Sequence, residues 1–271
     1  MAGGWRALSE RLLDLLFPPR CATPGCGRRG GAICALCLAA APTVPARRCA
    51  VCGDAVLDGD SFTAPGGAAV ARPDAGRAAR CRRCAEHPPA FAFAVAAWRH
   101  EAPVTSWIHA LKYDRRAAVA GPLGRCAGRM LTGDERAPHL DGACVVPVPA
   151  HPGRRRERGV DAAGRIAAAV AAELGAPLAA EARRRSRATA PQVGTSRAAR
   201  RANVAGAFTA TPGLGGRMVV LVDDVLTTGA TADACAAALR HAGAGTVVVV
   251  TAARATRSAT LEACAAGQSE R

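Results

Sequence analysis

Hydrophobic runs alternate with alanine-rich helical segments over the last two thirds of the chain. Runs without polar alternation predict buried strands at 91–98, 143–148, 219–222 and 246–252. Apolar residues at helical spacing predict helices at 104–113, 117–131, 161–174 and 233–242. Strands that alternate with helices are typical of a parallel sheet covered by helices. The pattern therefore predicts an α/β domain, which we place at 89–254.

The two ends of the chain show different patterns. Residues 5–17 place tryptophan and leucine side chains at helical spacing and run into Pro18 and Pro19. We interpret 1–20 as an N-terminal amphipathic helix that packs against its own domain, with attachment to a membrane surface as the alternative. Residues 255–271 are interpreted as a loose C-terminal tail.

Targeting and membrane signals are weak. The apolar run at 12–17 is too short for a signal peptide and contains Asp14. We expect no membrane span, because no apolar run approaches the ~20 residues that one requires. These features favour a cytoplasmic protein, in which disulfides are uncommon.

Eight of the twelve cysteines form four pairs near the N-terminus. The spacings match those of zinc ligands in tetrahedral thiolate sites. The pairs are Cys21 with Cys26, Cys34 with Cys37, Cys49 with Cys52, and Cys81 with Cys84. We predict a small cysteine-rich, double zinc-ribbon-like module at 21–88, with structural Zn²⁺ and a loop at 54–80. Redox chemistry or chance cysteines are the alternative. Neighbouring pairs or crossed pairs can share a metal, and the sequence leaves both arrangements open.

The remaining cysteines are isolated along the chain, and we interpret them as small apolar residues. They are Cys126, Cys144, Cys235 and Cys264.

The stretch that follows the predicted strand at 219–222 carries the clearest chemistry. Two carboxylates come first and are followed by small and hydroxyl residues that lead into a helix. Such a strand, loop and helix bring backbone N–H groups to one concave spot that binds phosphate. The carboxylates would repel phosphate and suit hydroxyls or a divalent cation. An ordinary buried strand that turns into a helix is the alternative. The residues are Asp223, Asp224, Thr227, Thr228, Gly229, Ala230 and Thr231.

Basic side chains elsewhere are candidates for phosphate contacts. Lys112, the only lysine, lies between Leu111 and Tyr113. A cluster of arginines follows the predicted strand at 143–148, where it would neutralise a diphosphate or form a solvated charge run. Its members are Arg154, Arg155, Arg156 and Arg158.

The net charge of +15 favours polyanions, either nucleic acid or a substrate with several phosphates. Aromatic residues make up only 3% of the chain, which weakens a reading based on base stacking.

The stretch at 219–231 resembles the phosphoribosyl-pyrophosphate (PRPP) signature of type I phosphoribosyltransferases. The order of motifs along the chain resembles the ComF family of competence-associated proteins. These motifs are the paired cysteines, Leu111-Lys112-Tyr113, Val146-Pro147-Val148-Pro149, Arg158-Gly159, the stretch from Pro191-Gln192 to Asn203, and the PRPP signature.

The resemblance implies a type I phosphoribosyltransferase-like parallel sheet flanked by helices, behind a zinc module. It implies that Asp223 and Asp224 bind ribose hydroxyls, that 227–231 holds the 5′-phosphate, and that Mg²⁺ accompanies PRPP. The polar stretch at 189–203 resembles the hood loop that closes over PRPP, although its side chains would also suit a surface helix. Two departures are Asp161, where the family usually has Asn, and the wider first cysteine pair.

Three functions fit these residues. The first is a phosphoribosyltransferase linked to DNA uptake, competence or nucleotide salvage, with Asp223, Asp224, Lys112 and Arg158 as catalytic candidates. The second is a single-stranded DNA-binding competence protein with a regulatory or vestigial PRPP site, and with other competence or DNA-processing proteins as partners. The third is a nucleotide-sensing regulator. The sequence does not identify an acceptor substrate.

Overall fold

The computed structural model describes ten stretches of the chain. They are residues 19–55, 62–63, 69–70, 80–114, 116–137, 140–150, 160–180, 183–185, 208–210 and 213–255. Cys264 and nearly all of the predicted N-terminal helix and C-terminal tail lie outside these residues. None of the described helices is long and apolar enough to cross a membrane.

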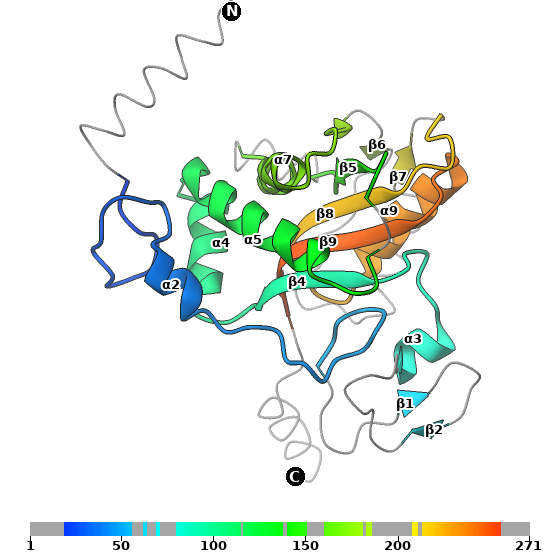
Figure 1. Ribbon diagram of the computed structural model, residues 1–271, viewed down its shortest axis with the longest axis horizontal. Coiled ribbons are helices and arrows are strands. Elements are labelled where there is room, and N and C mark those ends of the chain that lie inside the picture. Colours follow the sequence, from blue (N-terminus) through cyan, green and yellow to red (C-terminus); the bar gives the residue numbers. More distant parts are fainter. Residues whose placement is uncertain are drawn as a thin grey trace, which may run out of the picture.

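A four-stranded sheet forms the centre of the molecule (Figure 1). Its strands run parallel in the order β4, β9, β8, β5. Their bounds are Ala94–Arg99 for β4, Cys144–Pro147 for β5, Val219–Leu226 for β8 and Val247–Arg254 for β9. All four predicted strands are present. They form the parallel sheet that the alternation of strands and helices predicted.

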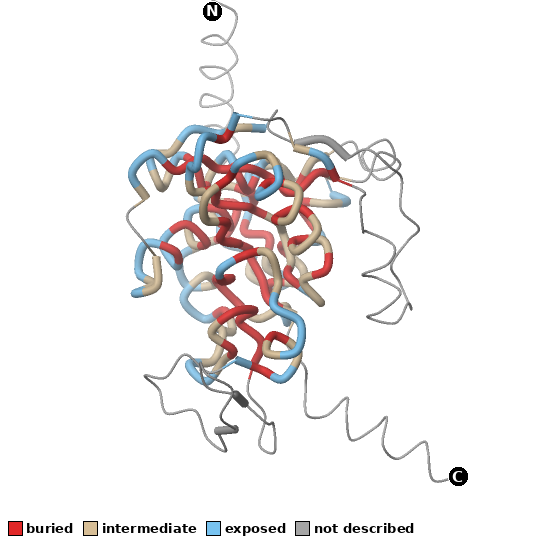
Figure 2. Tube along the Cα trace, turned by 90° about the vertical axis from the view of Figure 1, so that its right-hand side faces the viewer, coloured by how far each residue is buried: buried red, intermediate tan, exposed pale blue. Residues whose placement is uncertain are grey.

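Helices cover both faces of this sheet (Figure 1). The helices α4 (Val104–Lys112), α5 (Ala120–Thr132) and α7 (Ala162–Leu174) pack on one face, with the short 3₁₀ turn η1 (Ala117–Val119) before α5. The helix α9 (Ala230–His241) packs on the other. Alternate residues of each strand point to opposite faces. Val220 and Val222 therefore join the first core cluster, and Val219 and Leu221 join the second. Figure 2 shows the buried residues concentrated in the centre of the molecule.

Three smaller features surround the sheet. The antiparallel pair of strands β6 (Arg183–Arg185) and β7 (Phe208–Ala210) was not predicted. The cysteine-rich module contains the short helices α2 (Ala35–Ala39) and α3 (Arg82–Glu86). In the predicted loop at 54–80 and at its end, three short strands pair antiparallel, which the sequence did not indicate. They are β1 (Phe62–Thr63), β2 (Ala69–Val70) and β3 (Arg80–Cys81).

Candidate functional site

The site lies at the carboxyl edge of the parallel sheet. Asp223 and Asp224 stand near the end of β8, His100 follows the end of β4, and Arg254 ends β9. In open α/β sheets this edge is where ligands bind, because loops and helix N-termini converge there.

The sequence predicted that the two carboxylates follow the strand. In the structure they lie inside β8. The pairing of β8 with β9 continues through Asp223 opposite Thr251 and on to Leu226 opposite Arg254. Backbone pairing with β9 therefore extends the strand beyond its apolar run. The Asp224 amide donates to Asp223 Oδ1 at 2.9 Å, which fixes the geometry of the pair.

Lys112 belongs to this site. Its Nζ lies 2.7 Å from Oδ2 of Asp224, and both side chains are largely buried. The end of α4 brings the lysine to the sheet edge. The chain's single lysine therefore neutralises one of the two adjacent carboxylates.

Burial and the charge of Asp224 raise the pKa of Asp223 to about 7, while Lys112 opposes the rise. His100 interacts electrostatically with Lys112 and Asp224 of the same site. Burial, with the positive charge of Lys112, lowers the pKa of His100 against the opposing effect of Asp224. The site therefore contains a carboxyl group that titrates near neutral pH and an imidazole that favours its neutral form.

The small-residue loop connects β8 to α9. Gly229 has a φ of +80°, which favours glycine, and it caps the helix. The helix begins at Ala230 and not near 233 as predicted, so Ala230 and Thr231 lie in its first turn. Thr228 Oγ1 accepts from the Ala230 amide at 3.3 Å. The loop thus leads into a helix N-terminus beside the acid pair, the arrangement that binds anions.

The eight paired cysteines form two groups of four, each from neighbouring pairs. The first cysteine cluster is Cys21, Cys26, Cys34 and Cys37, and the second cysteine cluster is Cys49, Cys52, Cys81 and Cys84. Within each cluster the sulfur atoms lie within 4.8 Å of one another. The structure therefore brings together all the predicted metal ligands, and in the neighbouring arrangement.

The sulfur geometry suits zinc. Cys26 and Cys34 Sγ are 3.7 Å apart, and Cys52 and Cys81 Sγ are 3.8 Å apart. A tetrahedron with Zn–S bonds of ~2.3 Å has edges of ~3.8 Å. Both clusters are therefore compatible with structural zinc.

Asp161 has a structural task that its residue type explains. It is the N-cap of α7, and its Oδ1 accepts from the Gly164 amide at 2.9 Å. Asp and Asn serve equally well as N-caps. The exchange of the family's usual Asn for Asp therefore preserves the start of this helix.

Several predicted side chains lie outside the described residues. These are Arg154, Arg155, Arg156, Arg158 and the polar side chains from Thr189 to Asn203.

Sequence reasoning missed three residues at or behind the site: His100, Arg83 and Arg254. A polar residue at the end of an apolar strand was the available signal for His100 and Arg254. Nothing in the sequence set Arg83 apart from the other arginines.

Comparisons with known proteins agree with this geometry. A family model described as the phosphoribosyl transferase domain matches residues 159–265. The chain is 31% identical over 202 residues to the DNA utilization protein YhgH of Salmonella typhimurium, which covers 74% of this chain and 87% of that protein. This chain belongs to the ComF family.

YhgH proteins of other bacteria also match this chain. Those of Shigella flexneri and Escherichia coli K12 are each 32% identical over 175 residues, covering 62% of this chain and 75% of theirs. The phosphoribosyltransferase-type domain and the metal-compatible cysteine module are thus parts of one ComF-family protein.

Proposed function

We propose that this protein binds PRPP with Mg²⁺ at the carboxyl edge of the sheet and transfers its phosphoribosyl group. The observation that carries the proposal is the acid pair Asp223 and Asp224 directly before a glycine-containing loop and the N-terminus of α9. This arrangement lies within a match to the phosphoribosyl transferase domain. It offers acceptors for hydroxyls on one side and donors for a phosphate on the other.

The roles follow from the chemistry of the groups. Asp223 and Asp224 accept hydrogen bonds from the ribose hydroxyls, and the backbone of 227–231 donates to the 5′-phosphate. Mg²⁺ bound with PRPP neutralises charge on the diphosphate. Lys112 and Arg158 are the side chains that we assign to phosphate or diphosphate contact.

The transfer exchanges one bond at the ribose C1. The acceptor forms a bond to C1 as the bond from C1 to the diphosphate oxygen breaks, and the diphosphate leaves with the electron pair. The protein contributes positioning and charge stabilisation, and it needs no covalent nucleophile of its own. We place this activity in the cytoplasm, in DNA uptake or nucleotide salvage.

Calorimetry with PRPP and Mg²⁺ tests the proposal. Asp224→Asn removes a charged acceptor and should weaken binding about tenfold or more, since such hydrogen bonds contribute ~1.5–3 kcal/mol. The matched control is Asp141→Asn, an exposed acid before the amino end of β5, which should bind as the parent does. A parent protein that does not bind PRPP would refute the proposal. Diphosphate release with a panel of acceptors then identifies the reaction.

A second candidate is binding of single-stranded DNA, with the PRPP site regulatory or vestigial. It is favoured by the relatives' designation as DNA utilization proteins and by exposed arginines of the cysteine-rich module, among them Arg28, Arg29 and Arg47. Anisotropy titrations should then show a log–log salt slope of about −0.7 per phosphate contacted. Absence of binding at low salt would remove this candidate.

A further inference from the structure

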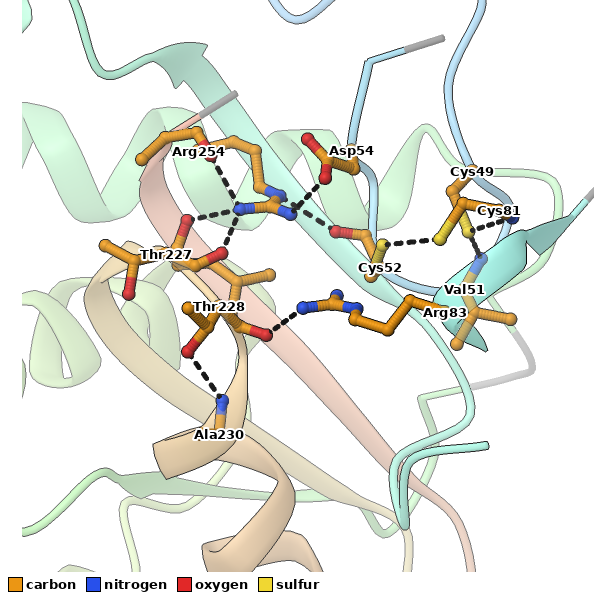
Figure 3. A network of polar contacts seen from close by, with 12 residues as sticks. Cys49, Val51, Cys52, Asp54, Cys81, Arg83, Thr227, Thr228, Ala230 and Arg254 are labelled. Carbon is orange, nitrogen blue, oxygen red and sulfur yellow. Dashed lines mark hydrogen bonds and ion pairs between the residues drawn. The ribbon is translucent and has the colours of Figure 1, made fainter. Parts of the chain in front are cut away.

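We call residues 226–229 the signature loop. Figure 3 shows the side chains of Arg83 and Arg254 between this loop and the second cysteine cluster. Arg83 stands between the cluster residues Cys81 and Cys84 in α3. Its Nη1 donates to the carbonyl oxygen of Thr228, which is 145 positions away in the sequence. The cysteine-rich module therefore contacts the backbone of the candidate phosphate loop through one of its own arginines.

Arg254 makes a second connection from the end of β9, and only 2% of it is exposed. Its Nη1 donates to the carbonyl oxygen of Leu226 at 2.7 Å and to that of Thr227. Its Nε donates to the carbonyl oxygen of Cys52 at 3.0 Å. Its Nη2 lies 3.4 Å from Oδ2 of Asp54. The buried guanidinium of Arg254 thus connects the carbonyl groups of Leu226 and Thr227 to Cys52 and Asp54.

Together the two arginines hold three consecutive carbonyl groups, those of 226, 227 and 228. In a planar trans peptide the carbonyl of one residue and the N–H of the next point in opposite directions. The N–H groups of Thr227, Thr228 and Gly229 are therefore directed away from the guanidinium groups. A row of such N–H groups forms an anion-binding nest. The hydrogen bonds from Arg83 and Arg254 to the loop carbonyls thus orient the N–H groups that would bind phosphate.

The first cysteine cluster is attached to a different part of the protein. Thr23 Oγ1 lies 3.4 Å from Cys21 Sγ and accepts from Trp107 Nε1 at 2.8 Å. Trp107 belongs to α4, on the face of the sheet opposite α9. The second cysteine cluster instead packs into the core on the α9 side. The two clusters therefore provide an internal comparison.

We propose that the second cysteine cluster, through Arg83 and Arg254, holds the signature loop in its phosphate-binding conformation, so that metal at this cluster sets the affinity for PRPP. Arg83 and Arg254 are positioning residues in this proposal, which rests on the proposed function. The helix α3 has only five residues, and so short a helix is not stable by itself in water. Metal ligation by Cys81 and Cys84 is what fixes Arg83 against the loop.

Charge favours the same arrangement. Four thiolates on one Zn²⁺ leave a net charge of about −2. A guanidinium beside them is stabilised there and remains available to donate to Thr228. The carbonyl of Thr228 thus has a charged donor, Arg83, whose position depends on the metal site.

The decisive experiment compares Arg83→Met with Arg82→Met, its neighbour in α3. Arg82 faces solvent and pairs with Glu86 at 2.7 Å, so its removal changes the net charge equally without touching the loop. We expect Arg83→Met to bind PRPP about tenfold more weakly or worse, as for the loss of a charged hydrogen bond, with its zinc content unchanged. Arg82→Met should bind as the parent does. Equal affinity of the two variants would overturn the proposal.

Amide hydrogen exchange without ligand gives a readout independent of PRPP. We expect faster exchange at 227–231 in Arg83→Met than in Arg82→Met, with β9 unchanged in both. If the parent fails to bind PRPP, the proposed function fails and this comparison alone decides the inference. Equal exchange at 227–231 would then overturn it.

Ligand substitution tests the part played by the metal. Cys84→Ser and Cys37→Ser should each cost one zinc ion, but only Cys84→Ser should weaken PRPP binding. Equal loss of affinity in both variants would contradict a specific role of the second cysteine cluster. If either cysteine variant does not fold, the comparison of Arg83→Met with Arg82→Met still tests the proposal.

Discussion

Asp223 is a carboxyl group whose charge changes near neutral pH. Its pKa is about 7 in the folded protein, because of burial and the charge of Asp224, against ~3.9 in an unfolded chain. Between these values the folded state binds more protons than the unfolded state. The stability that this group contributes is therefore complete below about pH 4 and is lost as the pH rises through 7.

Replacement of Asp223 by Asn should remove this pH dependence. We expect Asp223→Asn to be more stable than the parent at pH 8, with the difference shrinking toward pH 6. Denaturant unfolding at several pH values without ligand measures it, with Asp141→Asn as the control. A stability difference that is constant from pH 6 to 8 would show that Asp223 titrates elsewhere.

Lys112 has a predicted effect on the same group. Its positive charge lowers the pKa of Asp223, so Lys112→Met should move that pKa upward. Lys112→Arg keeps the charge and should leave it nearly unchanged. Carbon-13 detection of the Asp223 carboxyl during a pH titration reports the shift directly. An unchanged pKa of Asp223 in Lys112→Met would mean that the lysine is not a neighbour of the acid pair in solution.

At the scale of elements, α5 and α7 cross closely because α5 carries glycines at the contact. A Cβ at Gly124 would lie 2.5 Å from the Cβ of Ala169 and 2.6 Å from the carbonyl oxygen of Ile166. Gly124→Val should therefore lower the free energy of unfolding by about 1–3 kcal/mol through overpacking.

Gly121→Ala is the matched control for this helix contact. Its Cβ would meet only the flexible end of Arg125, at 3.2 Å. It should change stability by no more than ~1 kcal/mol, in the favourable direction, because alanine is the better helix former. Denaturant unfolding compares the two, and similar stability of Gly124→Val and the parent would contradict the close crossing.

The elements themselves were largely predictable, and their ends were not. Hydrophobic period gave β5, β8, β9, α4 and α7 within a few residues, since these elements bury whole faces. The extension of β8 to Leu226 comes from pairing with β9, and the early start of α9 comes from the left-handed Gly229. Both depend on partners or backbone angles that a residue pattern does not encode.

The same limit applies to the candidate site. The acid pair, the loop and all eight paired cysteines were predicted, because their chemistry lies in local spacing. The contacts of Arg83 and Arg254 were not, because they join segments far apart in the sequence. Their role is visible only in the structure, where they donate to the carbonyl groups of 226, 227 and 228.

At the scale of the whole molecule, metal should hold the cysteine-rich module to the sheet at two places. We expect about two zinc ions per chain, one in each cluster. Metal analysis of protein purified without chelator measures this, and protein without zinc would refute it. A value near one would mean that the wider pair, Cys21 and Cys26, does not close a site.

The two zinc ions should leave at different rates. All four residues of the second cysteine cluster are buried, whereas three of the first are only partly buried. A chelator therefore reaches the first cysteine cluster more easily. A colorimetric zinc-release assay should show a fast phase and a slow phase of equal size, and Cys37→Ser should remove the fast one. Removal of the slow phase by Cys37→Ser would reverse the assignment. Because the slow zinc lies behind the signature loop, PRPP affinity should persist through the fast phase and fall only with the slow one.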